Sequence, residues 1–240
     1  MAKRKIGYFC YNTFLALAAL ILSPIILFRI LAYYKLRFNF HKDFSKNIKP
    51  VIWVHAVSEQ QLIAAENVLH GLRTILSDYQ PVVTYTGWNM EKAVQTVKSK
   101  YLFKILPYPI EFCFKTIVSR IKPCLFIVFE DCFYPNQIRF CKAAGSKVAL
   151  INGRVNNKLS LIFRLAPNFL KSTFEQIDLL MMGTVAEANR IGQMGAHLSA
   201  IMVSDVISYQ DELNDEVELN GNNIVNKGIC TIGTLLGRNL

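Results

Sequence analysis

The sequence predicts an α/β protein with a doubly wound, mostly parallel sheet. Short apolar runs rich in β-branched and aromatic residues, typical of buried strands, alternate along the chain with longer segments whose apolar residues recur at helical spacing. Polar residues follow several of these runs directly, as expected where parallel strands end at a ligand crevice. Such alternation indicates parallel strands with helices on both faces. With 240 residues and 52% hydrophobic content, the chain is long enough for one such domain plus appendages.

The first element is expected to be a transmembrane helix. Residues 6–28 contain no charge and exceed the roughly 20 residues that cross a bilayer. Basic residues flank the run on both sides, so the positive-inside rule does not decide its orientation. A cleaved signal peptide and an amphipathic or core helix are the alternatives, but no small-residue cleavage site follows the run. We therefore assign residues 1–36 to a membrane anchor and 37–50 to a basic linker along the headgroups.

Residues 51–204 carry the α/β pattern. Strands are expected at 51–57, 81–86, 124–129, 147–151, 178–183 and 199–203. Helices are expected at 62–76, 89–100, 110–121, 136–144, 160–175 and 185–194. The pattern stops in 205–240, where an acidic, asparagine-rich linker precedes an apolar fragment, 228–233, that resembles the opening strand of another domain.

A candidate ligand-binding edge follows the first strand. His55 lies at its end, and Ser58 and Gln61 have the spacing of a capping box at the start of the next helix. The carboxyl ends of parallel strands face the ligand crevice, which favours a site role for these side chains. A structural histidine and a simple helix cap are the alternative interpretations.

Later strands end in polar residues that should reach the same edge. Glu130 and Asp131 follow the third predicted strand, and Asn152 and Arg154 follow the fourth. Arg154 could pair with Glu130 or bind a phosphate beside helix N-termini, or it could be a solvated loop cation. Tyr134-Pro135-Asn136 could simply begin a helix. No glycine-rich nucleotide-binding fingerprint is present.

Charge and cysteine usage narrow the classes of partner. The net charge of +10 suits contact with anionic membrane lipid or a phosphorylated substrate. Nucleic acid is the other standard partner of a basic protein, but no zinc-finger or RNP-like pattern accompanies the charge. No metal is expected, because none of the 4 histidines lies at ligand spacing from another. The 6 cysteines form no CxxC pair and are predicted to be reduced thiols of a cytosolic domain.

Three motifs after the apolar run resemble the amino-terminal half of 3-deoxy-D-manno-octulosonic acid (Kdo) transferases. These two-domain GT-B glycosyltransferases of lipopolysaccharide biosynthesis carry His-Ala-x-Ser-x-Gly-Glu, Glu-x-Glu-x-Trp-Pro-Asn and Asn-Ala-Arg. The chain has His55-Ala-Val-Ser-Glu-Gln-Gln61, Glu130-Asp-Cys-Phe-Tyr-Pro-Asn136 and Asn152-Gly-Arg154 in the same order.

The resemblance implies a function and a site. Residues 51–204 would be the acceptor-side domain of an enzyme that transfers Kdo from CMP-Kdo to a lipid A precursor, without a cofactor or metal. It would act at the cytoplasmic side of the inner membrane. The residues that match the motifs and would bind the acceptor are His55, Ser58, Glu130, Asn136, Asn152 and Arg154.

The chain also departs from the family pattern. The family's proposed general base is a glutamate at the position of Gln61, and an amide has no basic lone pair at neutral pH. Glu59 is a possible substitute if the turn brings it to the same side. The second carboxylate of the Glu-x-Glu motif is replaced by Cys132.

The length of the chain leaves a second hypothesis open. Family members continue into a domain that binds CMP-Kdo, and we expect the chain to lack that half. A truncated, catalytically inactive relative that retains membrane and lipid binding is therefore the alternative to an active transferase. A separate polypeptide could supply the donor domain. A membrane-anchored nucleic-acid-binding module is a remote third possibility that rests on charge alone.

Overall fold

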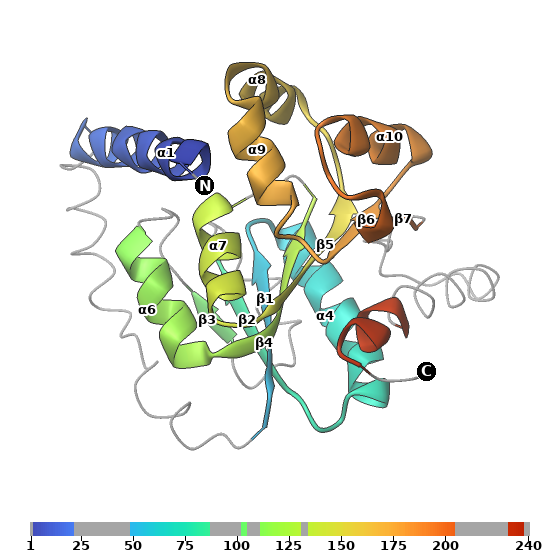
Figure 1. Cartoon of the computed structure of the whole chain (residues 1–240). Coiled ribbons are helices and arrows are strands. Elements are labelled where there is room, and N and C mark those ends of the chain that lie inside the picture. The colour runs from blue at the N-terminus through green and yellow to red at the C-terminus, as the bar shows by residue number, and fades with distance from the viewer. Residues whose placement is uncertain are drawn as a thin grey trace.

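The core of the protein is a parallel sheet with helices on both faces (Figure 1). The computed structural model describes residues 2–21, 49–86, 102–104, 111–130, 134–204 and 230–237. The sheet has 7 strands in the order β3-β2-β1-β4-β5-β6-β7, and each pairing between neighbours is parallel. The strands are β1 (Val51–Ala56), β2 (Gln80–Tyr85), β3 (Leu102–Lys104), β4 (Pro123–Phe129), β5 (Lys147–Gly153), β6 (Leu179–Met182) and β7 (Ile201–Val203). The predicted parallel α/β sheet is confirmed.

One predicted helix is divided in two in the structure. They are α1 (Ala2–Ile21), α4 (Glu59–Ile75), α6 (Glu111–Ile121), α7 (Pro135–Ala143), α8 (Asn157–Leu165), α9 (Pro167–Phe174) and α10 (Val185–Gln193), with a 3-10 turn η1 (Leu198–Ala200). The single helix predicted over 160–175 is two helices, because Pro167 cannot donate a backbone hydrogen bond and begins a new helix. The helix predicted over 89–100 lies outside the described residues, and the short strand β3 was missed.

Successive side chains of each strand point to opposite faces of the sheet, so a hydrophobic core forms on each face. Trp53 and Phe126 point to one face, where their rings lie 4.4 Å apart under α6, α7 and α9. Ile52 and Val54 point to the other face and pack against α4. Every residue of β1 is buried, as expected of a central strand covered on both sides.

The apolar fragment predicted as the opening strand of another domain is helical. Residues 230–235 form a helix, which Figure 1 shows in red beside α4. Ile232 is fully buried in the core on the α4 face, and Leu235 and Leu236 pack against the same core. Apolar residues at positions 232, 235 and 236 have helical spacing, so the strand prediction was wrong about this segment.

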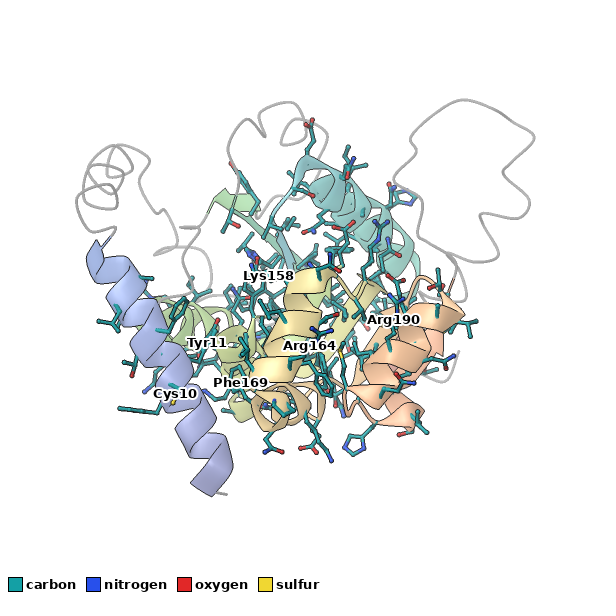
Figure 2. The ribbon with its side chains drawn as sticks, turned by 90° about the horizontal axis from the view of Figure 1, so that it is seen from above. Cys10, Tyr11, Lys158, Arg164, Phe169 and Arg190 are labelled. Carbon is teal, nitrogen blue, oxygen red and sulfur yellow. The ribbon has the colours of Figure 1, made fainter. Side chains whose placement is uncertain are left out.

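The predicted transmembrane helix over residues 6–28 is not found. Among the described residues, no helix combines the length and apolar character that crossing a bilayer requires. Residues 22–28 of the predicted span lie outside the described residues. The helix α1 instead packs along α9, with the rings of Tyr11 and Phe169 5.4 Å apart (Figure 2). Gly7 faces Phe169 as well, so one side of α1 is turned to protein.

Candidate functional site

The strand order reverses between β1 and β4, where the fold class predicts a ligand crevice. The chain leaves β1 toward β2 on one side, whereas β4 is followed by β5 on the other side, so the order of the strands reverses between them. Ligands of open α/β sheets bind at the carboxyl ends of the strands at such a point. The helix α4 begins directly after β1, and α7 begins shortly after β4. Their N-termini therefore flank the crevice.

Ser58 caps the helix α4 as predicted. Its backbone is extended (φ −133°, ψ 162°), and its Oγ accepts a hydrogen bond from Gln61 N at 3.2 Å. The reciprocal half of the predicted capping box is different. The Oε1 of Gln61 accepts from Val57 N at 3.0 Å, one residue before the cap. The side chain of Gln61 is thereby folded back over the end of β1.

Gln61 connects the two strand ends. Its Nε2 donates to Oε2 of Glu130 at 2.9 Å, although the two residues are 69 positions apart. Gln61 is 2% exposed, whereas Glu130 is only partly buried. The contact brings the first and second motifs together at the carboxyl ends of β1 and β4.

The backbone of Glu130 has a left-handed conformation, with φ 56°. Its N–H donates to Ile151 O at 2.8 Å, and its carbonyl accepts from Arg154 N at 3.4 Å. Asn152 is left-handed as well, with φ 54°, and is buried. The third motif therefore holds the turn at Glu130 through main-chain contacts, whereas the side chain of Arg154 is exposed.

His55 is a buried, neutral residue beneath the crevice. It is 1% exposed, and its Nδ1 lies 2.9 Å from Thr84 Oγ1. Burial lowers the pKa of His55 from 6.5 to about 4, and a hydrogen bond with the backbone of Thr84 opposes this shift. The rings of Tyr134 and His55 pack edge to face, with 5.6 Å between their centroids. His55 is therefore a buried residue of the candidate site and carries no charge at neutral pH.

Thr84 is a residue of the candidate site to which we had assigned no acceptor-binding role. Its Oγ1 contacts His55 and also accepts a hydrogen bond from Trp53 Nε1 at 2.8 Å. Thr84 lies on β2, in register with His55 on β1. One hydroxyl thus satisfies two buried polar side chains of the neighbouring strand. Its position in the polar strand end 84–87 was the available signal.

Asn136, predicted to bind the acceptor, is covered by α1. It is fully buried, and its Nδ2 donates to Oδ1 of Asn12 at 2.8 Å. Within the described part of the chain, no group donates a hydrogen bond to the Oδ1 of Asn136. Asn12 was not predicted as functional, because it lies within the apolar run that had been assigned to the membrane. The sequence signal was that polar pair, Asn12-Thr13, in the middle of the run.

Glu59, the possible substitute base, lies apart from this cluster. It is the first residue of α4 and is exposed. Asp131 and Cys132 lie outside the described residues. No cluster of three or more potential metal ligands occurs in the part of the chain that the structure describes. Cys10, Cys124, Cys141 and Cys230 carry free thiols.

Comparison with known proteins identifies the family. Residues 33–209 match the family model described as 3-deoxy-D-manno-octulosonic-acid transferase (Kdotransferase). The chain belongs to the Kdotransferase family. This match spans all three motifs and the whole sheet.

Curated relatives agree with this membership. The 3-deoxy-D-manno-octulosonic acid transferase of Chlamydia trachomatis serovar D is 25% identical over 219 residues, which are 85% of this chain and 49% of that protein. The transferase of Haemophilus influenzae is 22% identical over 185 residues, 75% of this chain and 43% of that protein. The chain spans about half the length of the curated relatives it matches.

Solved structures show the same fold in other proteins. A UDP-N-acetylglucosamine 2-epimerase structure has a TM-score of 0.53 and 13% identity, covering 70% of this chain and 53% of the other. The S. aureus MnaA–UDP co-structure has a TM-score of 0.51 and 12% identity, covering 71% of this chain and 50% of the other. At such low identity the likeness describes the fold alone.

Proposed function

We propose that this chain forms the acceptor-side domain, of GT-B type, of a glycosyltransferase that transfers Kdo from CMP-Kdo to a lipid A precursor. The observation that carries the proposal is the hydrogen bond between Gln61 and Glu130. It joins two Kdotransferase motifs at the reversal of strand order, where ligands of this fold class bind. The match of residues 33–209 to the family supports the same function.

The acceptor would enter from the open side of the crevice. Glu130 and Ser58 are partly exposed there and offer oxygen atoms to sugar hydroxyls. The exposed guanidinium of Arg154 follows β5 at the same edge and suits a phosphate group. His55, Asn136 and Asn152 are buried, so they would shape the site from behind rather than contact a ligand.

We further propose that the domain rests on the cytoplasmic surface of the inner membrane through α1 and α8. Both helices contact α9 and lie at the end of the molecule where the strands end (Figure 1). Phe14 and Leu17 on α1 are 69% and 56% exposed, and Leu161 and Leu165 on α8 are 55% and 77% exposed.

Charge accompanies this apolar surface. Lys158 and Arg164 are exposed on α8 (Figure 2), the helix that also carries the exposed leucines. Basic side chains near a membrane surface are attracted to anionic headgroups, at about 1 kcal/mol each. A lipid acceptor held in that bilayer would present its sugar to the crevice, because α8 begins directly after β5.

The test of the transferase proposal uses the full-length gene product. Purified protein is incubated with CMP-Kdo and a lipid A precursor, and the lipid is analysed by mass spectrometry. We expect a mass increase of one or more Kdo residues that requires CMP-Kdo. A second assay measures binding of the diphosphorylated lipid to residues 1–240, with Arg154→Ala compared with the exposed control Arg190→Ala. Only Arg154→Ala should weaken binding, by roughly tenfold for one charge-assisted contact.

One alternative is favoured by a specific observation. The family base position holds Gln61, whose amide is engaged by Val57 and Glu130, so a relative that binds the lipid without transferring Kdo fits this side chain as well. Lipid binding that depends on Arg154, without any mass increase from CMP-Kdo, is the outcome that selects this alternative.

The membrane proposal is tested by flotation with vesicles of phosphatidylethanolamine and phosphatidylglycerol. Leu161→Ser/Leu165→Ser should weaken binding strongly, since each buried leucine contributes about 1.5–3 kcal/mol. Leu198→Ser is the matched control, because Leu198 is 79% exposed but lies on η1. Equal flotation of all three proteins would refute the α8 contact.

A further inference from the structure

The hydrogen bonds of Gln61 fix which way its amide faces. A backbone N–H can only donate, so the atom that accepts from Val57 N at 3.0 Å must be the amide oxygen. The amide nitrogen then faces Glu130 Oε2 at 2.9 Å, and a carboxylate oxygen can accept from it. Both contacts agree with one orientation, so Gln61 presents a donor to Glu130 and has no basic atom for a ligand.

This arrangement shows what a glutamate at position 61 would meet. One of its carboxylate oxygens would take the Val57 hydrogen bond, and the other would lie at hydrogen-bond distance from Glu130. Two carboxylates this close cannot both ionise and must share a proton. The family base position and Glu130 are therefore neighbours in one site, and in this chain Glu130 is the member of that pair that carries a carboxylate.

Helix geometry separates Glu59 from that site. Residues two positions apart on an α-helix point about 200° away from each other. Gln61 is buried toward the crevice, whereas Glu59 is exposed at the start of α4. Glu59 thus lies on the side of α4 opposite to Gln61 and does not replace the family glutamate.

We propose that Glu130 is the general base of this chain and that Gln61 is the positioning residue that holds its carboxylate. The inference rests on the proposed Kdo transfer. Glu130 takes the proton of the acceptor hydroxyl as the hydroxyl oxygen forms a bond to C2 of Kdo. The bond from C2 to the phosphate oxygen breaks in the same displacement, and CMP leaves with that electron pair.

The main-chain contacts of Glu130 suit this role. Its N–H and its carbonyl are held by the end of β5 through Ile151 and Arg154, while Gln61 holds the carboxylate from α4. A side chain fixed from two elements keeps its position while remaining partly exposed to a ligand. The partial burial leaves Oε1 or Oε2 within reach of a hydroxyl that enters the crevice.

The test measures kcat and KM of the full-length gene product with CMP-Kdo and a lipid A precursor. Glu130→Gln keeps the shape and removes the base, and we expect kcat to fall roughly 10²–10⁴-fold, the contribution of a positioned base, with KM little changed. Glu175→Gln is the control, since Glu175 is an exposed residue at the end of α9. Thermal denaturation of each variant verifies folding.

A variant in which residues 61 and 130 exchange their side-chain types tests whether kcat requires a carboxylate held by an amide. Gln61→Glu/Glu130→Gln restores one carboxylate and one amide in the reverse order, so we expect it to recover at least tenfold of the kcat lost in Glu130→Gln. Gln61→Leu, which keeps a buried side chain but donates nothing, should lower kcat without that recovery. Because the exchange also restores the hydrogen bond, Gln61→Leu separates the two roles: a purely structural contact would lower its melting temperature and leave kcat unchanged.

The outcomes separate the two proposals. If the unmodified protein transfers no Kdo, the proposed function fails and the base assignment fails with it. If the unmodified protein transfers Kdo and Glu130→Gln does so equally fast, only the base assignment is wrong. Loss of kcat in Glu59→Gln with an active Glu130→Gln would assign the base to Glu59.

Discussion

Asn136 on α7 donates a hydrogen bond to Asn12 on α1 at 2.8 Å, across 124 positions of the sequence. It is a polar contact between the N-terminal helix and the α/β domain, beside the apolar contact of Tyr11 with Phe169. Without this contact, the amide nitrogen of the fully buried Asn136 would lose its acceptor on Asn12. The docking of α1 should therefore depend on this pair.

Asn12→Ala should loosen α1. The variant leaves the buried Nδ2 of Asn136 without its acceptor, which costs about 1–3 kcal/mol. Hydrogen exchange of the α1 amides should become faster, while exchange in β1 should not change. Thr13→Ala, on the exposed side of α1, is the control. Asn12→Leu/Asn136→Leu should be closer to the unmodified protein, because it removes both amides together.

Thr84→Val should destabilise the whole domain. Valine has nearly the shape of threonine but lacks the hydroxyl that contacts Trp53 and His55. Two buried polar groups lose a partner, so we expect a loss of about 2–4 kcal/mol in urea denaturation. Thr13→Val, at an exposed position, should change stability little. A Thr84→Val protein as stable as the original would mean that other groups satisfy both rings.

The stability of the domain should decrease when the pH is lowered, because of His55. Its pKa is lowered from 6.5 to about 4 on folding, so the unfolded chain binds a proton more readily. This contribution is fully present above pH 6.5 and is lost as the pH falls from about 6.5 to 4, up to about 3 kcal/mol. His55→Gln should flatten that part of the profile in denaturation experiments. An unchanged profile would contradict the buried neutral state.

Ser58→Ala should affect both stability and the site. Removing the cap costs about 1 kcal/mol, and Asn156→Ala, which removes the cap of α8, should cost about the same. Of these two caps, Ser58 is the one that accepts from the backbone N–H of Gln61, so Ser58→Ala and not Asn156→Ala should also weaken the proposed Kdo transfer. Equal transfer rates in the two variants would separate the cap from the site.

The sequence was sufficient for the sheet but not for the role of α1. The strand pattern is local, so β1, β2, β4, β5 and β6 could each be recognised from their own residues, whereas the three-residue edge strand β3 could not. Hydropathy along residues 6–28 counts apolar residues without regard to the side on which they lie. It could not show that Gly7 and Tyr11 face Phe169, because that contact depends on where α9 lies in the fold.

The sequence predicted the edge of the sheet at which the candidate site lies, but not which of its residues contact one another. Polar residues after strands indicated that Gln61 and Glu130 would reach the same rim. Their direct bond requires β1 and β4 to be neighbours, and the strand order cannot be read from alternation. Burial of His55 was equally inaccessible, since it arises from Thr84 and Tyr134 on other elements.

The left-handed backbone of Glu130 has an evolutionary consequence. Glycine adopts φ 56° freely and asparagine tolerates it, whereas a glutamate there is strained by about 1–2 kcal/mol. Variants selected only for heat resistance should therefore accumulate glycine or asparagine at position 130. Variants selected for the proposed Kdo transfer should keep the glutamate. At position 130, selection for thermal stability and selection for catalytic activity should therefore favour different amino acids.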